Sequence, residues 1–258
     1  LRERLSPPVT VTETLPAPAL LRTPKGETVL DFGQEITGWV RFRCHAPEGA
    51  RIFLQYGEIL QDGCFYNDNL RSAKAEYAYI SNGEAREIRP YFTFYGFRYV
   101  KVEGLEHLDP SDFTACVLHT ALDRTGWVET SDPRVNRLFL NALWGQRGNF
   151  LDVPTDCPQR DERMGWTGDA EVFCPTASFN LHTPAFYRKY LYDMLAEQRG
   201  LYHGSVPHVV PMVIHDPKRD QHGSCAWADA AAIIPWQQYL FYGDKALLEQ
   251  EYPNMTAW

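Results

Sequence analysis

The spacing of apolar residues changes midway along the chain, and this change limits the folds that the sequence can adopt. In the first half, apolar and polar residues alternate in the runs 39–44, 51–56, 76–80, 91–102 and 113–119, which is typical of strands with one buried face. Turn sequences rich in Gly, Asn, Asp and Pro separate the runs, which favours an antiparallel β-sandwich over parallel β-α-β units. The first two runs predict a core face made of Val40, Phe42, Cys44, Ile52, Leu54 and Tyr56.

The second half follows the period of an α-helix. The segments 133–143, 184–195 and 230–241 place apolar residues three and four positions apart, so each predicts a helix with one apolar face. Asp132, followed by a proline, is typical of a helix start, because the aspartate side chain accepts from a backbone N–H and proline suits the first helical position. A further helix is expected to start near Thr167.

These two halves predict two domains, a β-sandwich over residues 1–125 and a helical domain over residues 126–258. The composition, 44% hydrophobic and 22% charged, is that of a globular chain, and no apolar run reaches the roughly 18 residues that a membrane span needs. The net charge of −8 opposes binding to phosphate backbones. We therefore expect neither a membrane nor a nucleic acid as partner.

The cysteines indicate the compartment. They are scattered without a CxxC pair in a chain large enough to fold without covalent links, so we expect free thiols in a reducing compartment, the cytoplasm. The first residues lack the pattern of a signal peptide. A periplasmic or secreted location is the alternative, because a leader could have been removed from the start of this sequence. The six cysteines are Cys44, Cys64, Cys116, Cys157, Cys174 and Cys225.

The segment 149–173 (NFLDVPTDCPQRDERMGWTGDAEVF) concentrates charged residues in a predicted loop between two helices. Pro154 and Pro158 stiffen this loop, and Gly165 and Gly168 permit tight turns, so its side chains are held in place. Crowded carboxylates cannot all ionise at low cost, and one of them is therefore expected to keep its proton near neutral pH and act as a general acid. The acids of the segment are Asp152, Asp156, Asp161, Glu162, Asp169 and Glu171.

Three other interpretations of this segment compete with acid catalysis. Charged loops are commonly solvated, and here the acids could pair with Arg160 and Arg163. Carboxylates also bind Mg²⁺ or Ca²⁺, but the EF-hand spacing is absent and the arginines would compete with a cation, so we expect no metal. Cys157 could act as a nucleophile with a downstream histidine as base, although a packed thiol fits its surroundings better. Glycine-rich phosphate-binding motifs do not occur, and we expect no cofactor.

Three stretches of the second half resemble the bacterial α-L-rhamnosidases, a family of inverting glycoside hydrolases: WGQRGNF at 144–150, VPTDCPQRDERMGWTGDAEVF at 153–173 and WADAAAIIPW at 227–236. In the first half, DFGQEITGWVRF, NLRSAKA and PYFTFYGFRYVKVEG resemble the sandwich domain of that family. The resemblance covers residues 29–258. It implies that the helices form the N-terminal part of an (α/α)6 toroid and that the substrate is a rhamnose-containing oligosaccharide or glycoside.

The resemblance also implies roles for individual residues. Glu162 matches the general acid that protonates the glycosidic oxygen as the bond to L-rhamnose breaks. The other matching positions belong to the same sugar pocket: Asp156, Arg160 and Asp169 match polar residues that hold the rhamnose hydroxyls, and Trp166 and Trp227 match its aromatic walls.

Inverting hydrolysis also needs a general base, about 6.5 to 9.5 Å from the acid. The resemblance places this base, a glutamate, late in the toroid and beyond the stretch that corresponds to Trp258, while Glu249 and Glu251 are expected to be surface charges. We therefore expect the 258 residues to be an incomplete fragment that lacks the base and is inactive or nearly so.

Two other functions fit parts of the sequence. A carbohydrate-binding sandwich module, with the helices as its support, would expose aromatic rings on one sheet face, and the run 91–99 offers six candidates. Filling the sandwich core is the expected role of these rings. The second alternative is a toroid hydrolase that acts on another sugar, but the length of the matching run favours rhamnose.

Overall fold

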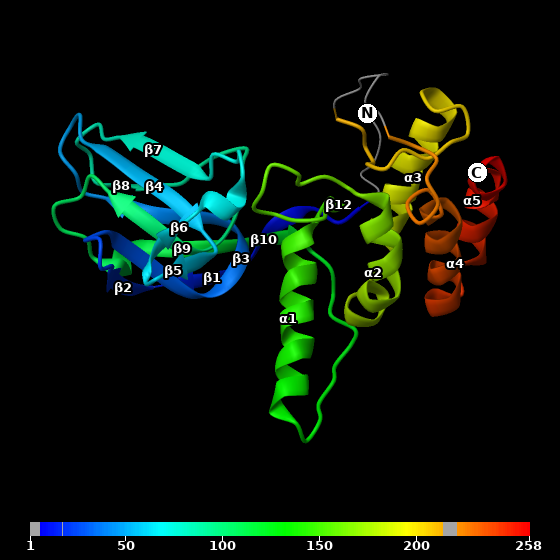
Figure 1. Ribbon diagram of the computed structural model, residues 1–258, viewed down its shortest axis with the longest axis horizontal. Coiled ribbons are helices and arrows are strands. Elements are labelled where there is room, and N and C mark those ends of the chain that lie inside the picture. Colours follow the sequence, from blue (N-terminus) through cyan, green and yellow to red (C-terminus); the bar gives the residue numbers. More distant parts are fainter. Residues whose placement is uncertain (1–5, 17, 214–220) are drawn as a thin grey trace. The chain divides into compact units, whose positions relative to one another are not determined.

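The structure, a computed structural model, describes residues 6–16, 18–213 and 221–258. Strands occupy the first half of the chain, and helices occupy most of the second half (Figure 1). This order agrees with the change of period in the sequence, because each half forms the secondary structure that its spacing of apolar residues favours.

Contacts divide the chain into two compact units. Among the described residues, the β-rich unit combines 10–16 and 18–119 with the short segment 157–162, and the helical unit combines 120–156, 163–213 and 221–258 with 6–9. The segment 157–162 therefore belongs to the β-rich unit by its contacts, although the chain on both sides of it belongs to the helical unit.

The β-rich unit is built on a curled sheet in which eight strands are connected by hydrogen bonds (Figure 1). The long strand β3 pairs antiparallel with four others, and the register of its pairing with β9 shifts between Asp31 and Ile36. The order is β1-β10-β3-β9-β4-β7, with β2 and β8 also on β3. The strands are β1 (Val9–Pro16), β2 (Ala19–Arg22), β3 (Thr28–Cys44), β4 (Arg51–Gly57), β7 (Glu76–Ile80), β8 (Arg86–Ile88), β9 (Tyr95–Glu103) and β10 (Phe113–Thr120), beside a small pair, β5 (Ile59–Gln61) and β6 (Cys64–Tyr66).

The core of the sheet contains the face that the alternation predicts. All six predicted side chains of β3 and β4 are buried. The aromatic run at 91–99 is divided: Tyr95 and Phe97 are buried, and Tyr95 stacks on Tyr56 with ring centroids 4.0 Å apart. Tyr91 and Phe92, which precede β9, are exposed. Core filling therefore accounts for Tyr95 and Phe97, while Phe94 and Tyr99 are half-buried and two rings lie at the surface.

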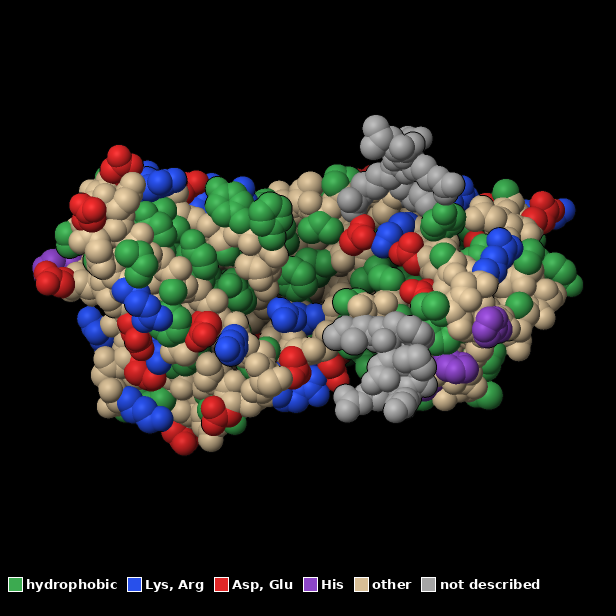
Figure 2. Space-filling view, turned by 90° about the horizontal axis from the view of Figure 1, so that it is seen from above, with side chains coloured by type: hydrophobic (Ala, Val, Ile, Leu, Met, Phe, Trp, Pro, Cys, Tyr) green, Lys and Arg blue, Asp and Glu red, His purple; other side chains and the backbone are tan. Residues whose placement is uncertain are grey.

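Charged side chains of the β-rich unit are interspersed on the face seen in Figure 2. Acidic and basic groups alternate there and do not gather into a patch of one sign.

The helical unit contains α1 (Pro133–Asn149), a short pair of strands, β11 (Phe150–Leu151) and β12 (Val153–Pro154), and four further helices. As predicted, the Asp132 side chain accepts from the Arg134 N–H at 2.9 Å at the start of α1. Helix α4 packs on α2, α3 and α5. No helix in the described part of the chain combines the length and the apolar character that crossing a bilayer requires. The four helices are α2 (Thr167–Asn180), α3 (Pro184–Gly200), α4 (Ala230–Tyr242) and α5 (Lys245–Ala257).

The predicted apolar faces of the helices are buried to different extents. On α3, Tyr187, Tyr190, Leu191 and Met194 are fully buried, as their spacing predicts. On α1 and α4 the stripes lie in the predicted helices, but several of their members are exposed, Leu138 at 68% among them. In α4 the buried row is instead Ala230, Ala231, Ile234, Pro235 and Gln238, and Gln238 donates to Ser178 of α2 at 3.0 Å.

One buried acid of the β-rich unit lacks partners. Glu35 lies in β3 where the pairing with β9 is broken, and both of its carboxylate oxygens are buried without a hydrogen-bond partner among the described residues. Burial, together with the nearby charge of Glu58, raises the pKa of Glu35 to about 8, while Arg98 opposes this shift.

We expect Glu35→Gln to raise the thermal stability of the protein most strongly at high pH. The pKa of Glu35 is about 8 in the folded chain and lies above its ordinary value of 4.5, so between these values the folded state holds a proton that the unfolded state has released. The stability therefore falls as the pH rises through this window, and glutamine removes the dependence. The Tm difference from the wild type should be small near pH 5 and largest above pH 8. With the exposed Glu87→Gln as control, a Tm difference independent of pH would contradict the prediction.

Candidate active site

The charged segment begins on the short strand pair that follows α1. Between β11 and β12, Asp152 occupies the turn with a left-handed backbone, φ 68°. The Lys189 Nζ of α3 lies 2.8 Å from a carboxylate oxygen of Asp152 and 2.8 Å from one of Asp193. Asp152, one of the acids predicted to crowd together, is therefore used in an ion pair that attaches the start of the segment to α3.

The segment then forms a loop whose two ends meet at Asp156 and Met164. The Asp156 N–H donates to the Met164 carbonyl oxygen at 3.1 Å, and the Met164 N–H donates to Asp156 Oδ1 at 3.2 Å. Gly165 follows at a crowded position, where an added Cβ would lie 2.2 Å from the carbonyl oxygen of Val210. The Tyr190 hydroxyl and the Val210 N–H both donate to the Gly165 carbonyl. These contacts fix both ends of the loop on the helical unit.

The helical unit contains a cavity of about 640 Å³. Its walls come from α1, from the strand pair β11 and β12 and the residues that follow it, from the first turns of α2, from Tyr187 of α3 and from Ala226 and Trp227. Asp156, Asp169 and Trp227, three residues that the resemblance assigns to sugar binding, all line this space. The Asp169 side chain is exposed, and no hydrogen bond or ion pair from a described residue satisfies its carboxylate. The cavity therefore combines a free hydrogen-bond acceptor with an aromatic wall.

The aromatic wall depends on a glycine of α2. At Gly168 an added Cβ would lie 3.0 Å from the indole ring of Trp227 and 3.0 Å from the carbonyl oxygen of Ala226, so the absence of a side chain lets Trp227 approach the helix. The imidazole of His208 also stacks on Trp227 with centroids 5.4 Å apart. These two contacts limit the orientations of the indole.

Glu162 and Arg160 lie in the segment that belongs to the β-rich unit. Arg160 NH2 is 2.9 Å from Glu162 Oε2, and Arg71 NH2 is 3.3 Å from Glu162 Oε1. Arg160 thus contacts the residue that matches the general acid. This part of the site is built from side chains that are distant in sequence, because Arg71 follows the short 3-10 helix η1 (Asp68–Leu70).

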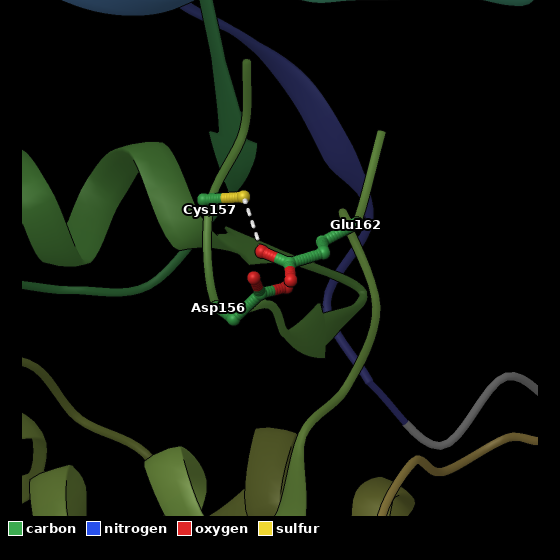
Figure 3. A group of neighbouring side chains, drawn as sticks. All are labelled: Asp156, Cys157 and Glu162. Atoms are coloured by element: carbon green, nitrogen blue, oxygen red, sulfur yellow. Dashed lines mark hydrogen bonds between the residues drawn. The ribbon is translucent and has the colours of Figure 1, made fainter. Parts of the chain in front are cut away.

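The ligand atoms of three side chains in this loop lie within 4.8 Å of one another (Figure 3). They are Asp156, Cys157 and Glu162, and the Cys157 thiol donates to Glu162 Oε2 at 3.8 Å. A cation at this point would have to compete with two guanidinium groups that already contact Glu162. The contacts of Cys157 fit those of a packed thiol, since its side chain is buried.

Two predictions about the segment differ from what the structure shows, one about an aromatic wall and one about a raised pKa. Trp166, expected as an aromatic wall, precedes α2 and is not among the residues that line the cavity. Glu171 is buried in α2, where burial, and after it the charge of Asp229, raises its pKa to about 7. The raised pKa expected from crowding therefore occurs at an acid to which the sequence assigned no role, and burial is its main cause.

Both halves of the chain match family models. Residues 123–258 match the bacterial alpha-L-rhamnosidase 6 hairpin glycosidase domain, and residues 21–119 match the bacterial alpha-L-rhamnosidase concanavalin-like domain. The order of a sandwich domain and a domain of helical hairpins confirms the fold class predicted from the sequence.

Individual relatives are similar to this chain over nearly its whole length. An alpha-L-rhamnosidase from Streptomyces avermitilis is 41% identical over 254 residues, which are 97% of this chain and 24% of that protein. Its crystal structure complexed with L-rhamnose has a TM-score of 0.92 at 40% identity and covers 99% of this chain and 24% of that one. Native alpha-L-rhamnosidase from Aspergillus terreus has a TM-score of 0.91 at 40% identity, over 98% of this chain and 29% of that one. The chain thus spans about a quarter of the length of these relatives.

Proposed function

The chain belongs to the bacterial α-L-rhamnosidase family, and we propose that the protein hydrolyses terminal, non-reducing α-L-rhamnose from oligosaccharides and glycosides. The observation that carries this proposal is the cavity of the helical unit, where Asp156, Asp169 and Trp227 face one space. Its volume of about 640 Å³ falls in the range of small-molecule sites and leaves room for a monosaccharide.

In this proposal the cavity binds the rhamnose ring. The free carboxylate of Asp169 accepts a hydrogen bond from a sugar hydroxyl, and a charged acceptor makes a stronger bond than a neutral one. The indole of Trp227 packs against the C–H groups of the sugar ring. Asp156 shares its Oδ1 with the Met164 N–H, so a contact with the sugar would couple the sugar to the closed loop.

Glu162 is the proposed general acid of an inverting mechanism. Its carboxyl proton is transferred to the glycosidic oxygen as the bond from that oxygen to C1 of rhamnose breaks. A water molecule attacks C1 from the opposite face and gives its proton to a base, so that β-L-rhamnose leaves first. Arg160, which contacts Glu162, is proposed to help hold the rhamnose hydroxyls, and Trp166 to supply a second wall.

We also propose that residues 1–258 alone bind the sugar without turning it over. Activation of the water needs a second carboxylate, and the resemblance assigns that role to a residue outside this sequence. A chain that holds only the acid would lose the contribution of the base, which is about 10²- to 10⁴-fold in rate.

The proposal is tested with nitrophenyl α-L-rhamnoside and, as controls, the corresponding α-L-fucoside and α-D-glucoside. We expect the full-length protein to release nitrophenol from the rhamnoside alone. The 258-residue chain should bind L-rhamnose and release little nitrophenol. Equal hydrolysis of the three glycosides would contradict the proposed substrate, and full turnover by the 258-residue chain would contradict the proposed need for an outside base.

A further inference from the structure

The segment that carries Glu162 is held on the β-rich unit at several points. Pro158 and Gln159 pack over Gly96 of β9, where an added Cβ would lie 2.7 Å from the Gln159 Cβ. The Gln159 side chain lies close enough to Glu58 to lower the pKa of that carboxyl, which burial otherwise raises, and the Glu58 carboxylate accepts a hydrogen bond from Asn69 Nδ2 at 2.9 Å. The first half of the segment therefore rests on the sheet and on the loop that contains η1.

The second half of the segment is held by Arg71 and Ser72. Arg71 NH2 lies 2.7 Å from Asp161 Oδ1 and 3.3 Å from Glu162 Oε1, and its NH1 donates to the same Glu162 oxygen at 3.3 Å. The Ser72 hydroxyl donates to Asp161 Oδ2. This hydrogen bond, reinforced by the charge of Arg71, lowers the pKa of Asp161, which keeps that carboxylate ionised at neutral pH. One guanidinium therefore bridges two consecutive acids.

Arg71 lies on a closed backbone turn at the end of η1. Arg71 ends η1 with φ 59° and ψ −118°, a conformation that is uncommon for a residue other than glycine. The turn is closed by bonds from the Arg71 N–H to Asp68 and from the Ala73 N–H to the Leu70 carbonyl, and Leu70 is buried beneath it. The turn fixes the point from which the Arg71 side chain extends, and the contacts with Asp161 and Glu162 hold its guanidinium.

We propose that Arg71 is a positioning residue for the general acid. By bridging Asp161 and Glu162 it limits the orientations of the Glu162 carboxyl group, while Arg160 contacts the other oxygen of the same group. The inference rests on the proposed role of Glu162. The planar fork of an arginine suits two neighbouring carboxylates, whereas a lysine ammonium is a single point charge.

The test compares two substrates of the full-length protein. Methyl α-L-rhamnoside has a poor leaving group and depends on protonation by the acid, whereas dinitrophenyl α-L-rhamnoside departs without it. We expect Arg71→Met to lower kcat for the methyl glycoside by about 10- to 100-fold, the effect of a misplaced catalytic group, with KM nearly unchanged. The dinitrophenyl glycoside should lose less than about threefold. Each variant is measured at its own pH optimum, so that a change in protonation does not enter the comparison.

Three variants make the outcome decisive. Arg71→Lys should recover part of the lost kcat, and Arg41→Met, which breaks a surface ion pair with Glu87 in the same unit, should match the wild type. Equal losses on both substrates, or no loss, in Arg71→Met would overturn the positioning role. Glu162→Gln is measured beside them. If Glu162→Gln does not lose more kcat on the methyl glycoside than on the dinitrophenyl glycoside, Glu162 is not the general acid and this inference fails with that proposal. If Glu162→Gln loses more kcat on the methyl glycoside and Arg71→Met does not, only the positioning role of Arg71 is overturned.

Discussion

Replacing Glu162 with glutamine is expected to lower kcat for methyl α-L-rhamnoside by about 10²- to 10⁴-fold in the full-length protein, which is the usual contribution of a general acid. Glutamine nearly preserves the size of the side chain but has no carboxyl proton to transfer. The loss should shrink to less than about tenfold for dinitrophenyl α-L-rhamnoside, because its leaving group is stable as an anion. Steady-state kinetics on the two substrates measure the difference.

The neighbouring contacts of Glu162 supply the control. Asp161 precedes it and contacts Arg71 as well, so Asp161→Asn perturbs the same ion-pair group without removing the proposed acid. We expect a much smaller effect on the methyl glycoside than that of Glu162→Gln. If Glu162→Gln retained near-normal turnover of the methyl glycoside, the acid would have to be another residue.

Asp169→Ala is expected to weaken the binding of L-rhamnose by about 10- to 100-fold, because a hydrogen bond to a charged group contributes roughly 1.5 to 3 kcal/mol. Its carboxylate lines the cavity and has no protein partner among the described residues, so the loss should appear in sugar affinity while the Tm stays close to that of the wild type. Calorimetric titration of the full-length protein with L-rhamnose measures the affinity, and Asp169→Asn, which keeps a neutral acceptor, should lose less.

The same titration separates the cavity from a sugar site on the sandwich. Tyr91 and Phe92 are the exposed aromatic residues of the run at 91–99, and a carbohydrate-binding sandwich would use them. We expect Phe92→Ala to bind L-rhamnose as the wild type does. Weaker binding by Phe92→Ala together with unchanged binding by Asp169→Ala would favour the sandwich as the binding unit.

Local patterns in the sequence predicted those elements whose buried face is decided by their own residues. The strand β7 begins and ends where the alternation places it, and α1 begins after Asp132, whose side chain caps it. The face of α4 could not be predicted in this way. Gln238 is buried there because Ser178 of α2 accepts its hydrogen bond, while the apolar Leu240 is 57% exposed. The neighbours of a helix, and not its hydrophobic spacing alone, decide which side is covered.

In the candidate site, too, the residues of the local motif could be predicted from the sequence and the long-range contacts that support them could not. Its motif residues are close in sequence, and Asp156 and Asp169 do line one cavity with Trp227, which lies far along the chain. The supporting contacts have no local signature: Arg71 is 91 residues from Glu162, and Lys189 is 37 residues from Asp152. Only the matching stretch NLRSAKA, which contains Arg71, hinted that the loop after η1 matters. Long-range ion pairs of this kind depend on the folded backbone and cannot be read from spacing.

The proposed inverting hydrolysis is tested most directly by time-resolved proton NMR of an α-L-rhamnoside during cleavage by the full-length protein. Attack of water on the face opposite the departing group predicts that β-L-rhamnose appears first and that the α anomer follows only by mutarotation. Initial release of α-L-rhamnose, or no release of rhamnose, would contradict the proposed mechanism.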